Sequence, residues 1–265
     1  MNKMRLISHY KGYIKPELWD DNSDIYAITD DFVDKLEYKS IPKDKKVALM
    51  VEPRCLYPSA YEYLEKHYDE YKYIFTFDDR LLKLPNAKLM PYGTWWCMSD
   101  EKKTKGVSMI CSEKAFVEGH RKRQEIARRL FDEGLADVMG KWNGGEYVDT
   151  IEAFRDYKFN VAMENDLHDY YFTEKVCNCF ANKVVPIYYG ARKIGEFFDM
   201  DGIIYVEDRD TIPDIVRNLD IDKEYAKRKK AIDKNFELVK QYECYDDCFF
   251  AKYGDLIEEM FKWFM

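Results

Sequence analysis

Side chains able to bind an anionic, hydroxyl-bearing ligand gather between residues 157 and 191. A predicted strand ends at Glu164 and Asn165, and a polar loop leads from it to a predicted helix that begins with Thr173, Glu174 and Lys175. In open α/β sheets, ligands bind at the carboxyl ends of strands and at helix N-termini. A glutamate there could hold the two hydroxyls of a ribose, and the lysine a phosphate. The alternative, which spacing alone favours, is that Thr173 caps the helix and Glu174 complements its dipole.

A short basic segment elsewhere in the chain favours anion binding over the capping interpretation. Residues 101–130 carry 9 Lys and Arg against 4 Asp and Glu, although the 265-residue chain has a net charge of -8 and a pI of about 5.3. The overall acidity argues against a protein that binds nucleic acid nonspecifically, because such a protein needs a basic face. The segment fits a small polyanion such as a nucleotide diphosphate, and a solvated helix face is the other interpretation.

The elements that must position these side chains follow an α/β rhythm. An apolar run at 45–53 predicts a buried strand that ends near Glu52, and a helix at 59–71 and two further strand-like runs come after it. After a polar linker at 94–105, strands alternate again with helices, of which one at 119–135 and one at 173–183 are the clearest. No GxGxxG fingerprint and no P-loop motif occurs.

This rhythm predicts an α/β protein with two Rossmann-like domains that face a central cleft. We expect an N-terminal domain over 1–100 and a C-terminal, ligand-binding domain over 101–265. The last segment, 234–265, is predicted to be helical, and its aromatic spacing fits packing back on the N-terminal domain. A membrane-surface helix is the less favoured alternative, because Asp255, Glu258 and Glu259 would face anionic lipid.

The segment from 157 to 191 resembles the C-terminal signature of glycosyltransferase family 10, the α-1,3/α-1,4-fucosyltransferases. The matching residues are Glu164-Asn165, Asp169, Tyr171, Thr173-Glu174-Lys175 and Val185-Pro186 to Gly190, and a weaker likeness extends over 106–240. The resemblance implies a fold of the GT-B type and transfer of L-fucose from GDP-fucose to a glycan hydroxyl with inversion. It implies no obligatory cofactor and no catalytic metal.

The resemblance also assigns roles to individual residues. Asn165, Tyr171, Glu174 and Lys175 would bind the nucleotide, with Glu174 on the ribose and Lys175 on the diphosphate. The family's diphosphate-binding arginine falls on Arg123, with Arg121 as the second choice, and both lie in the basic segment.

An inverting transfer needs a general base, and Glu52, at the end of its strand, resembles the family's catalytic glutamate. The structural alternative is a turn carboxylate before Pro53. Asp78 and Asp79 also follow a strand and are the reserve candidates.

Departures from the family pattern leave the acceptor undefined. Met163 replaces an aromatic residue before Glu164, Lys183 stands where a small residue is common, and the N-terminal domain is short. The alternatives are a transferase that uses another nucleotide sugar, and a noncatalytic module that binds nucleotide or glycan. A metal-dependent transferase, which would hold its ion with paired carboxylates, is disfavoured because the resemblance implies no catalytic metal.

The chain's seven cysteines form no CxxC pair, which favours reduced thiols. The sequence shows no apolar run long enough for a signal peptide or a membrane span. We therefore expect a cytoplasmic protein. The resemblance implies that its partners are a nucleotide sugar and a glycan, and the overall acidity argues against nucleic acid.

Overall fold

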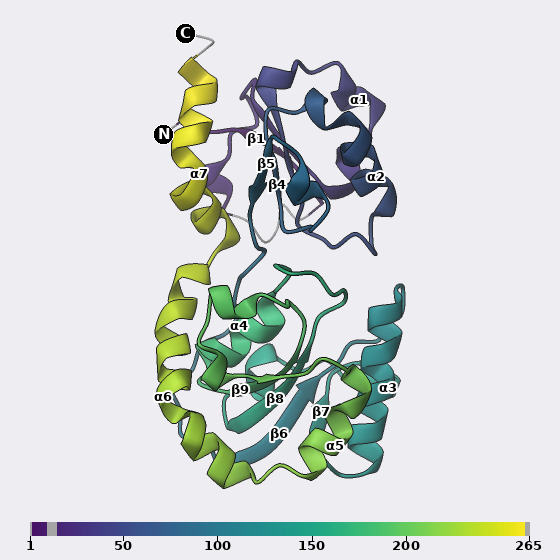
Figure 1. Ribbon diagram of the computed structural model, residues 1–265, viewed down its shortest axis with the longest axis vertical. Helices are drawn as coiled ribbons and strands as arrows, with labels where there is room; N and C mark the ends of the chain where they lie inside the picture. The colour runs from purple at the N-terminus through teal and green to yellow at the C-terminus, as the bar shows by residue number, and fades with distance from the viewer. Residues whose placement is uncertain (1, 10–14, 263–265) are drawn as a thin grey trace. The chain divides into compact units, whose positions relative to one another are not determined.

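The computed structural model describes residues 2–9 and 15–262, which form two compact units (Figure 1). Unit 1 consists of the described residues up to Tyr92, of His168–Tyr170, and of the described residues from Cys244 onward. Unit 2 consists of Gly93–Leu167 and Tyr171–Glu243. Each unit is built on its own parallel sheet.

Unit 1 contains a five-stranded sheet in the order β1-β2-β3-β4-β5, with all neighbouring strands parallel. The strands are β1 (Arg5–Ile7), β2 (Tyr26–Thr29), β3 (Lys46–Leu49), β4 (Ile74–Thr76) and β5 (Ala87–Leu89). Its helices are α1 (Leu36–Lys39), α2 (Pro58–His67) and α7 (Tyr245–Lys262). Because the strands are parallel, their carboxyl ends share one edge of the sheet.

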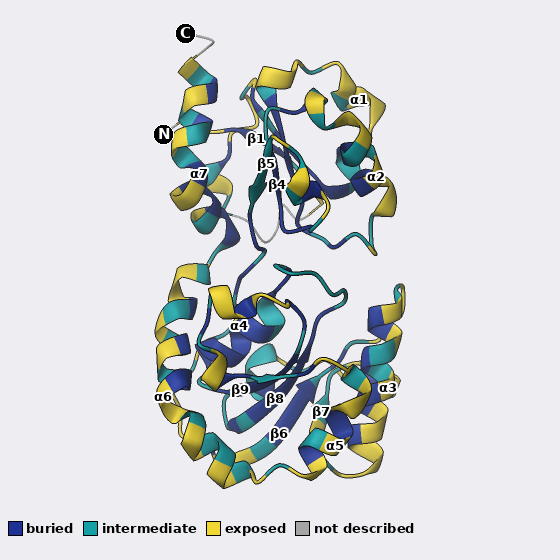
Figure 2. Cartoon of the chain, in the orientation of Figure 1, coloured by how far each residue is buried: buried dark blue, intermediate teal, exposed yellow. Residues whose placement is uncertain are grey.

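Helices cover both faces of this sheet. Strand residues such as Leu49 and Phe75 form one buried cluster with Phe249 and Ile257 of α7. The rings of Phe75 and Phe249 meet edge to face, with centroids 4.9 Å apart. Residues that alternate with these along the strands, such as Ala48, form a second buried cluster with α2. The buried stripe of α7 is visible in Figure 2.

Unit 2 contains a second five-stranded parallel sheet, in the order β10-β9-β8-β6-β7. The strands are β6 (Lys105–Ile110), β7 (Asp137–Met139), β8 (Tyr157–Met163), β9 (Val185–Tyr189) and β10 (Ile204–Tyr205). The helices are α3 (Glu118–Asp132), α4 (Glu174–Ala181), α5 (Ile212–Arg217) and α6 (Ile221–Val239). Two parallel sheets with helices on their faces confirm the predicted α/β class.

Unit 2 buries both faces of its sheet as well. Val161 of β8 packs in a cluster with Leu130 of α3 and Val216 of α5. Its neighbour Ala162 belongs to the opposite cluster, with Phe180 of α4. The sheet is therefore a middle layer between α3 and α5 on one side and α4 on the other (Figure 1).

The boundary between the units lies at Tyr92 and Gly93, so the expected boundary at residue 100 falls inside unit 2. The segment that the sequence presents as a polar linker is fastened to unit 2. The backbone N–H of Trp96 donates to Asn178 (2.8 Å), and buried Lys103 donates to the carbonyl of Arg155 (2.6 Å). The polar composition of this segment predicted a linker. Its hydrogen bonds go to residues that are distant in the sequence, and composition does not reveal such bonds.

A further difference concerns the first two strands. The sequence analysis gave no strand before residue 45, whereas β1 and β2 both lie there. The segment between β7 and β8 carries a 3₁₀ turn, Thr150–Ala153, with Asp149 as its cap. Within the described residues, none of the helices combines the length and the apolar character needed to cross a membrane.

Candidate donor-binding and base sites

The candidate ligand-binding side chains of unit 2 lie where β8 ends and α4 begins. Glu164 directly follows β8, and its side chain is completely buried. Its Oε1 accepts a hydrogen bond from the N–H of Thr173 (2.9 Å), and its Oε2 accepts one from the Thr173 hydroxyl (2.8 Å). Thr173 in turn caps α4 by accepting the N–H of Lys175. Glu164 thus fixes the start of α4 against the end of β8.

Lys175 lies between two carboxylates. Its Nζ is 3.4 Å from Glu164 Oε2 and 3.1 Å from Glu174 Oε1, and it donates to the Thr173 hydroxyl (2.9 Å). Burial alone would lower the pKa of Lys175, but the two carboxylates outweigh it and raise the pKa above its usual value. Burial raises the pKa of Glu164, whereas Lys175 and local hydrogen bonds overcome burial and lower the pKa of Glu174. The lysine is therefore a fixed cation at this end of the sheet.

Arg123, the predicted diphosphate ligand, comes from α3 and is buried. Its Nη1 donates to the carbonyl of Met163, the last residue of β8 (3.2 Å). The guanidinium therefore lies at the carboxyl end of the same strand that leads to Glu164. Arg121, the second choice, is exposed and donates to the carbonyl of Ala115 (3.0 Å).

His120 lies near these cations. His120 is buried in the first turn of α3, and its pKa falls to about 4. Burial is the main cause, and the positive charges of Arg123, Lys114, Lys175 and Arg121 act in the same direction. Arg123 also acts directly against protonation of Lys175. Cations from α3 and α4 thus lie at one end of the unit 2 sheet, together with the carboxylates that pair with Lys175.

Gly119 allows α3 to approach the end of β8 closely. A Cβ atom on Gly119 would lie only 2.0 Å from the backbone oxygen of Asn165. No side chain can be accommodated there without moving α3 or the residues after β8. The approach of Gly119 to Asn165 could not be predicted, because a single glycine in a helical pattern does not indicate which residue packs against it.

We expect Gly119→Ala to destabilise the protein by about 1–3 kcal/mol, the usual cost of overpacking, and to weaken nucleotide binding. Urea unfolding and titration with GDP would measure the two effects. Gly106→Ala is the matched control, because the nearest atom to its added methyl, Ile221 Cδ1, is 3.9 Å away. Equal stability of the two variants would contradict the close packing described here.

The other two predicted nucleotide ligands belong to the same region. Asn165 is partly exposed directly after Glu164, and Tyr171 is buried two residues before the cap Thr173. The structure thus brings Arg123, Asn165, Glu174 and Lys175 to the end of β8 and the starts of α3 and α4. Their contacts with a nucleotide remain predictions.

The predicted base, Glu52, lies in unit 1, three residues after the last residue of β3, and is partly exposed. Its backbone N–H donates to Asp30 Oδ1 (3.0 Å), and its carbonyl accepts from the Tyr61 hydroxyl (2.5 Å). Asp30 is a residue that the sequence analysis did not single out. It follows β2, a strand that was not predicted, so no pattern drew attention to it.

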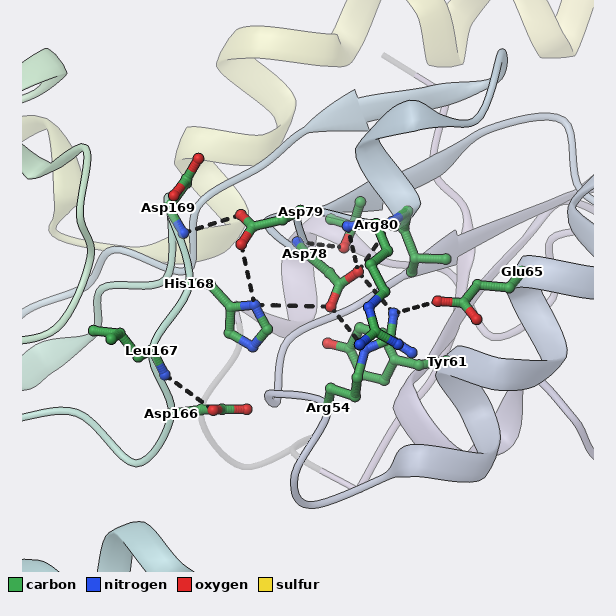
Figure 3. Close-up of polar contacts among 12 residues, drawn as sticks. Arg54, Tyr61, Glu65, Asp78, Asp79, Arg80, Asp166, Leu167, His168 and Asp169 are labelled. Atoms are coloured by element: carbon green, nitrogen blue, oxygen red, sulfur yellow. Dashed lines mark hydrogen bonds and ion pairs between the residues drawn. The ribbon is translucent and has the colours of Figure 1, made fainter.

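The reserve candidate Asp78 has both carboxylate oxygens engaged (Figure 3). It accepts two hydrogen bonds from Arg54, of 3.0 and 2.8 Å, and also accepts the N–H groups of Arg80 and Leu81. Burial would raise the pKa of Asp78, but Arg54 and the backbone donors outweigh it and lower the pKa. Asp78 is only 1% exposed, so it is built into the end of β4 rather than poised to accept a proton.

Asp79, the other reserve candidate, lies beside His168 and Asp169, which belong to unit 1 although they are distant from Asp79 in the sequence. Its Oδ1 accepts the N–H of Asp169 (3.0 Å), and its Oδ2 is 3.7 Å from His168 Nδ1 (Figure 3). These contacts explain why His168–Tyr170 belong to unit 1 although the residues on both sides belong to unit 2.

Comparison with known proteins places the chain in a family. Residues 100–252 match the model of glycosyltransferase family 10 (fucosyltransferase), C-terminal part. Over 103 residues, the chain is 32% identical to 4-galactosyl-N-acetylglucosaminide 3-alpha-L-fucosyltransferase 9 of Homo sapiens and of Bos taurus. This stretch covers 37% of the chain, and the chain spans about a quarter (26%) of the length of these relatives.

Solved structures agree on the fold. An α1,3-fucosyltransferase crystallised with GDP-fucose superposes with a TM-score of 0.53 over 85% of this chain and 80% of the other, at 16% identity. The same enzyme class with GDP gives the same TM-score at 15% identity. The fold is therefore of the GT-B type, as predicted. With more than half of its residues matched by the family model, the chain belongs to glycosyltransferase family 10.

Proposed function

We propose that this protein transfers L-fucose from GDP-fucose to a hydroxyl group of a glycan acceptor, with inversion at the anomeric carbon. The observation that carries the proposal is the placement of two cations at the carboxyl end of one parallel sheet: Arg123 donates to the carbonyl of the last residue of β8, and Lys175 lies in the first turn of α4 beside Glu164. Basic side chains and the free N–H groups of a helix N-terminus are the groups that bind phosphates in proteins. The names of the relatives, and a superposable structure that contains GDP-fucose, supply the choice of donor.

The roles within unit 2 follow from charge. Lys175 is held as a cation by Glu174 and Glu164, and Arg123 is held by the carbonyl of Met163. Both would bind the diphosphate and stabilise the negative charge that grows on it as the sugar leaves. Glu174 would accept the ribose hydroxyls, with Asn165 and Tyr171 completing the nucleotide site.

The transfer itself needs one proton acceptor. The acceptor hydroxyl would give its proton to the Glu52 carboxylate while its oxygen forms a bond to the anomeric carbon from the face opposite the diphosphate. The bond between that carbon and the phosphate oxygen breaks, and the electron pair leaves with GDP. The products are the fucosylated glycan, GDP and a proton, which Glu52 releases to water.

The first experiment is a melting-temperature scan with GDP, GDP-fucose, GDP-mannose, UDP-glucose and UDP-galactose. A ligand at 100 times its Kd stabilises the folded state by about 2.7 kcal/mol, which corresponds to about 5–10 °C for a domain of this size. We expect GDP and GDP-fucose to give this shift and the UDP compounds to give none. Stabilisation by UDP compounds alone would retain the fold and overturn the donor.

Binding must then be separated from turnover. Release of GDP from GDP-fucose in the presence of a glycan panel, with the anomeric configuration of the product read by NMR, tests transfer and inversion together. Nucleotide binding without GDP release from any acceptor in the panel would favour the noncatalytic alternative. A cytoplasmic location remains a prediction from the sequence.

A further inference from the structure

The backbone of Glu52 is held at both of its polar atoms by buried side chains. Directly after β3, the N–H of Met50 donates to the carbonyl of Phe75 in β4 (2.9 Å). Beyond it, Asp30 Oδ1 accepts the N–H groups of Val51 (2.9 Å) and Glu52 (3.0 Å). Asp30 therefore replaces the sheet as the partner of this segment.

The carbonyl of Glu52 is held from the other side by α2. The Tyr61 hydroxyl donates to it at 2.5 Å, and the Tyr61 side chain is completely buried. The guanidinium of Arg54 lies 4.8 Å from the Tyr61 ring centroid, and the same group is bound by Asp78 and Glu65 (Figure 3). The ring cannot shift without disturbing this ion-paired cluster.

Asp30 is kept in a costly state. Its φ is +45°, in the left-handed region that side chains other than glycine, asparagine and aspartate rarely adopt, and it is only 1% exposed. Burial raises the pKa of Asp30 to about 8, although the two N–H donors act against the rise. Among the described residues, its second oxygen, Oδ2, has no hydrogen-bond partner. The two N–H groups need only one acceptor oxygen, which an asparagine would also supply without a buried carboxyl.

We propose that Asp30 and Tyr61 are positioning residues for the transfer reaction, which hold the peptide of Glu52 so that its carboxylate keeps one orientation toward the acceptor hydroxyl. The proposal rests on the proposed function, since it assigns a purpose to the position of Glu52. A base displaced by about 1 Å can lose about a hundredfold in rate, so a clamp on its backbone would act on kcat rather than on donor binding.

The test uses two replacements of Asp30 that both tolerate its φ. Asp30→Asn keeps one oxygen to accept both N–H groups, whereas Asp30→Gly relaxes the backbone but removes the acceptor. We expect Asp30→Asn to retain kcat within about twofold. We expect Asp30→Gly to lower kcat about 10- to 100-fold, with the KM for GDP-fucose and the melting shift given by GDP unchanged.

Tyr61→Phe provides a second route if Asp30→Gly does not fold. It removes the hydroxyl that binds the Glu52 carbonyl and keeps the ring beneath Arg54, so kcat should fall several-fold without a change in KM for GDP-fucose. Wild-type kcat in folded Asp30→Gly, or in Tyr61→Phe, would overturn the proposal, as would an equal loss in Asp30→Asn and Asp30→Gly. Glu52→Gln separates failure of the positioning proposal from failure of the proposed function. Full activity of Glu52→Gln would overturn the choice of base rather than the role of Asp30 and Tyr61.

Discussion

Replacing Glu52 by glutamine should lower kcat for fucosyl transfer by about 10²- to 10⁴-fold, the usual contribution of a general base. The amide cannot accept the acceptor's proton, but it can keep the size and the backbone bonds of the glutamate, to Asp30 and Tyr61. Donor binding should not change, because the predicted nucleotide ligands all belong to unit 2. Initial rates at saturating GDP-fucose and acceptor, with GDP binding measured in parallel, would check both statements.

Glu62→Gln is the matched control for this variant. Glu62 is exposed on α2, so the same chemical change in the same unit should leave kcat unchanged. If Glu52→Gln retained the wild-type kcat, the base would have to be another carboxylate. Asp79→Asn would then be the next variant, because the Asp79 side chain is 30% exposed, whereas that of Asp78 is 1% exposed and bound by Arg54.

Lys175→Met should have the second large effect, on both donor binding and stability. Losing a charge-assisted contact to the diphosphate should weaken GDP binding about 10- to 150-fold. The variant also leaves buried Glu164 and its neighbour Glu174 without their shared cation, and breaking a buried ion pair costs up to about 3–5 kcal/mol. Calorimetric titration with GDP and denaturant unfolding would measure the two losses separately.

Lys122→Met tests whether position or mere charge is responsible. Lys122 lies in the same basic segment, next to Arg123, but its ion pair is with Glu125 at the surface. Surface pairs contribute about 0–1 kcal/mol, so this variant should bind GDP as the wild type does and lose little stability. Equal weakening in both variants would mean that the segment attracts nucleotide only through its overall charge.

The central strands of both sheets could be predicted because each is mostly apolar. β3, β8 and β9 are buried on both faces, and such strands stand out in any sequence. β1 and β2 have three and four residues and lie among charged residues, so they have too little length to show a pattern. Missing β2 also meant missing Asp30, whose importance comes from a contact with residues 21 and 22 positions away.

The position of Glu164, Asn165 and Thr173–Lys175 at the end of a strand and the start of a helix could be predicted because these residues are close together in the sequence. Glu164 and the segment Thr173–Lys175 form one motif, and Thr173 caps α4 as its position suggested. The sequence could not show that Glu164 is buried against Thr173, or that α3 touches Asn165 at Gly119. Contacts of this kind depend on how strands are ordered in the sheet, which local periodicity does not specify.

Unit 1 is assembled from three separate stretches of chain, and this constrains how the protein can be recombined. A fragment that stops at Tyr92 would lack α7 and leave Phe75 and Leu49 facing water. It would also lack His168 and Asp169, the neighbours of Asp79. A chimera that exchanges this unit with a relative must therefore move the N-terminal stretch, the tripeptide His168–Tyr170 and the residues from Cys244 onward together.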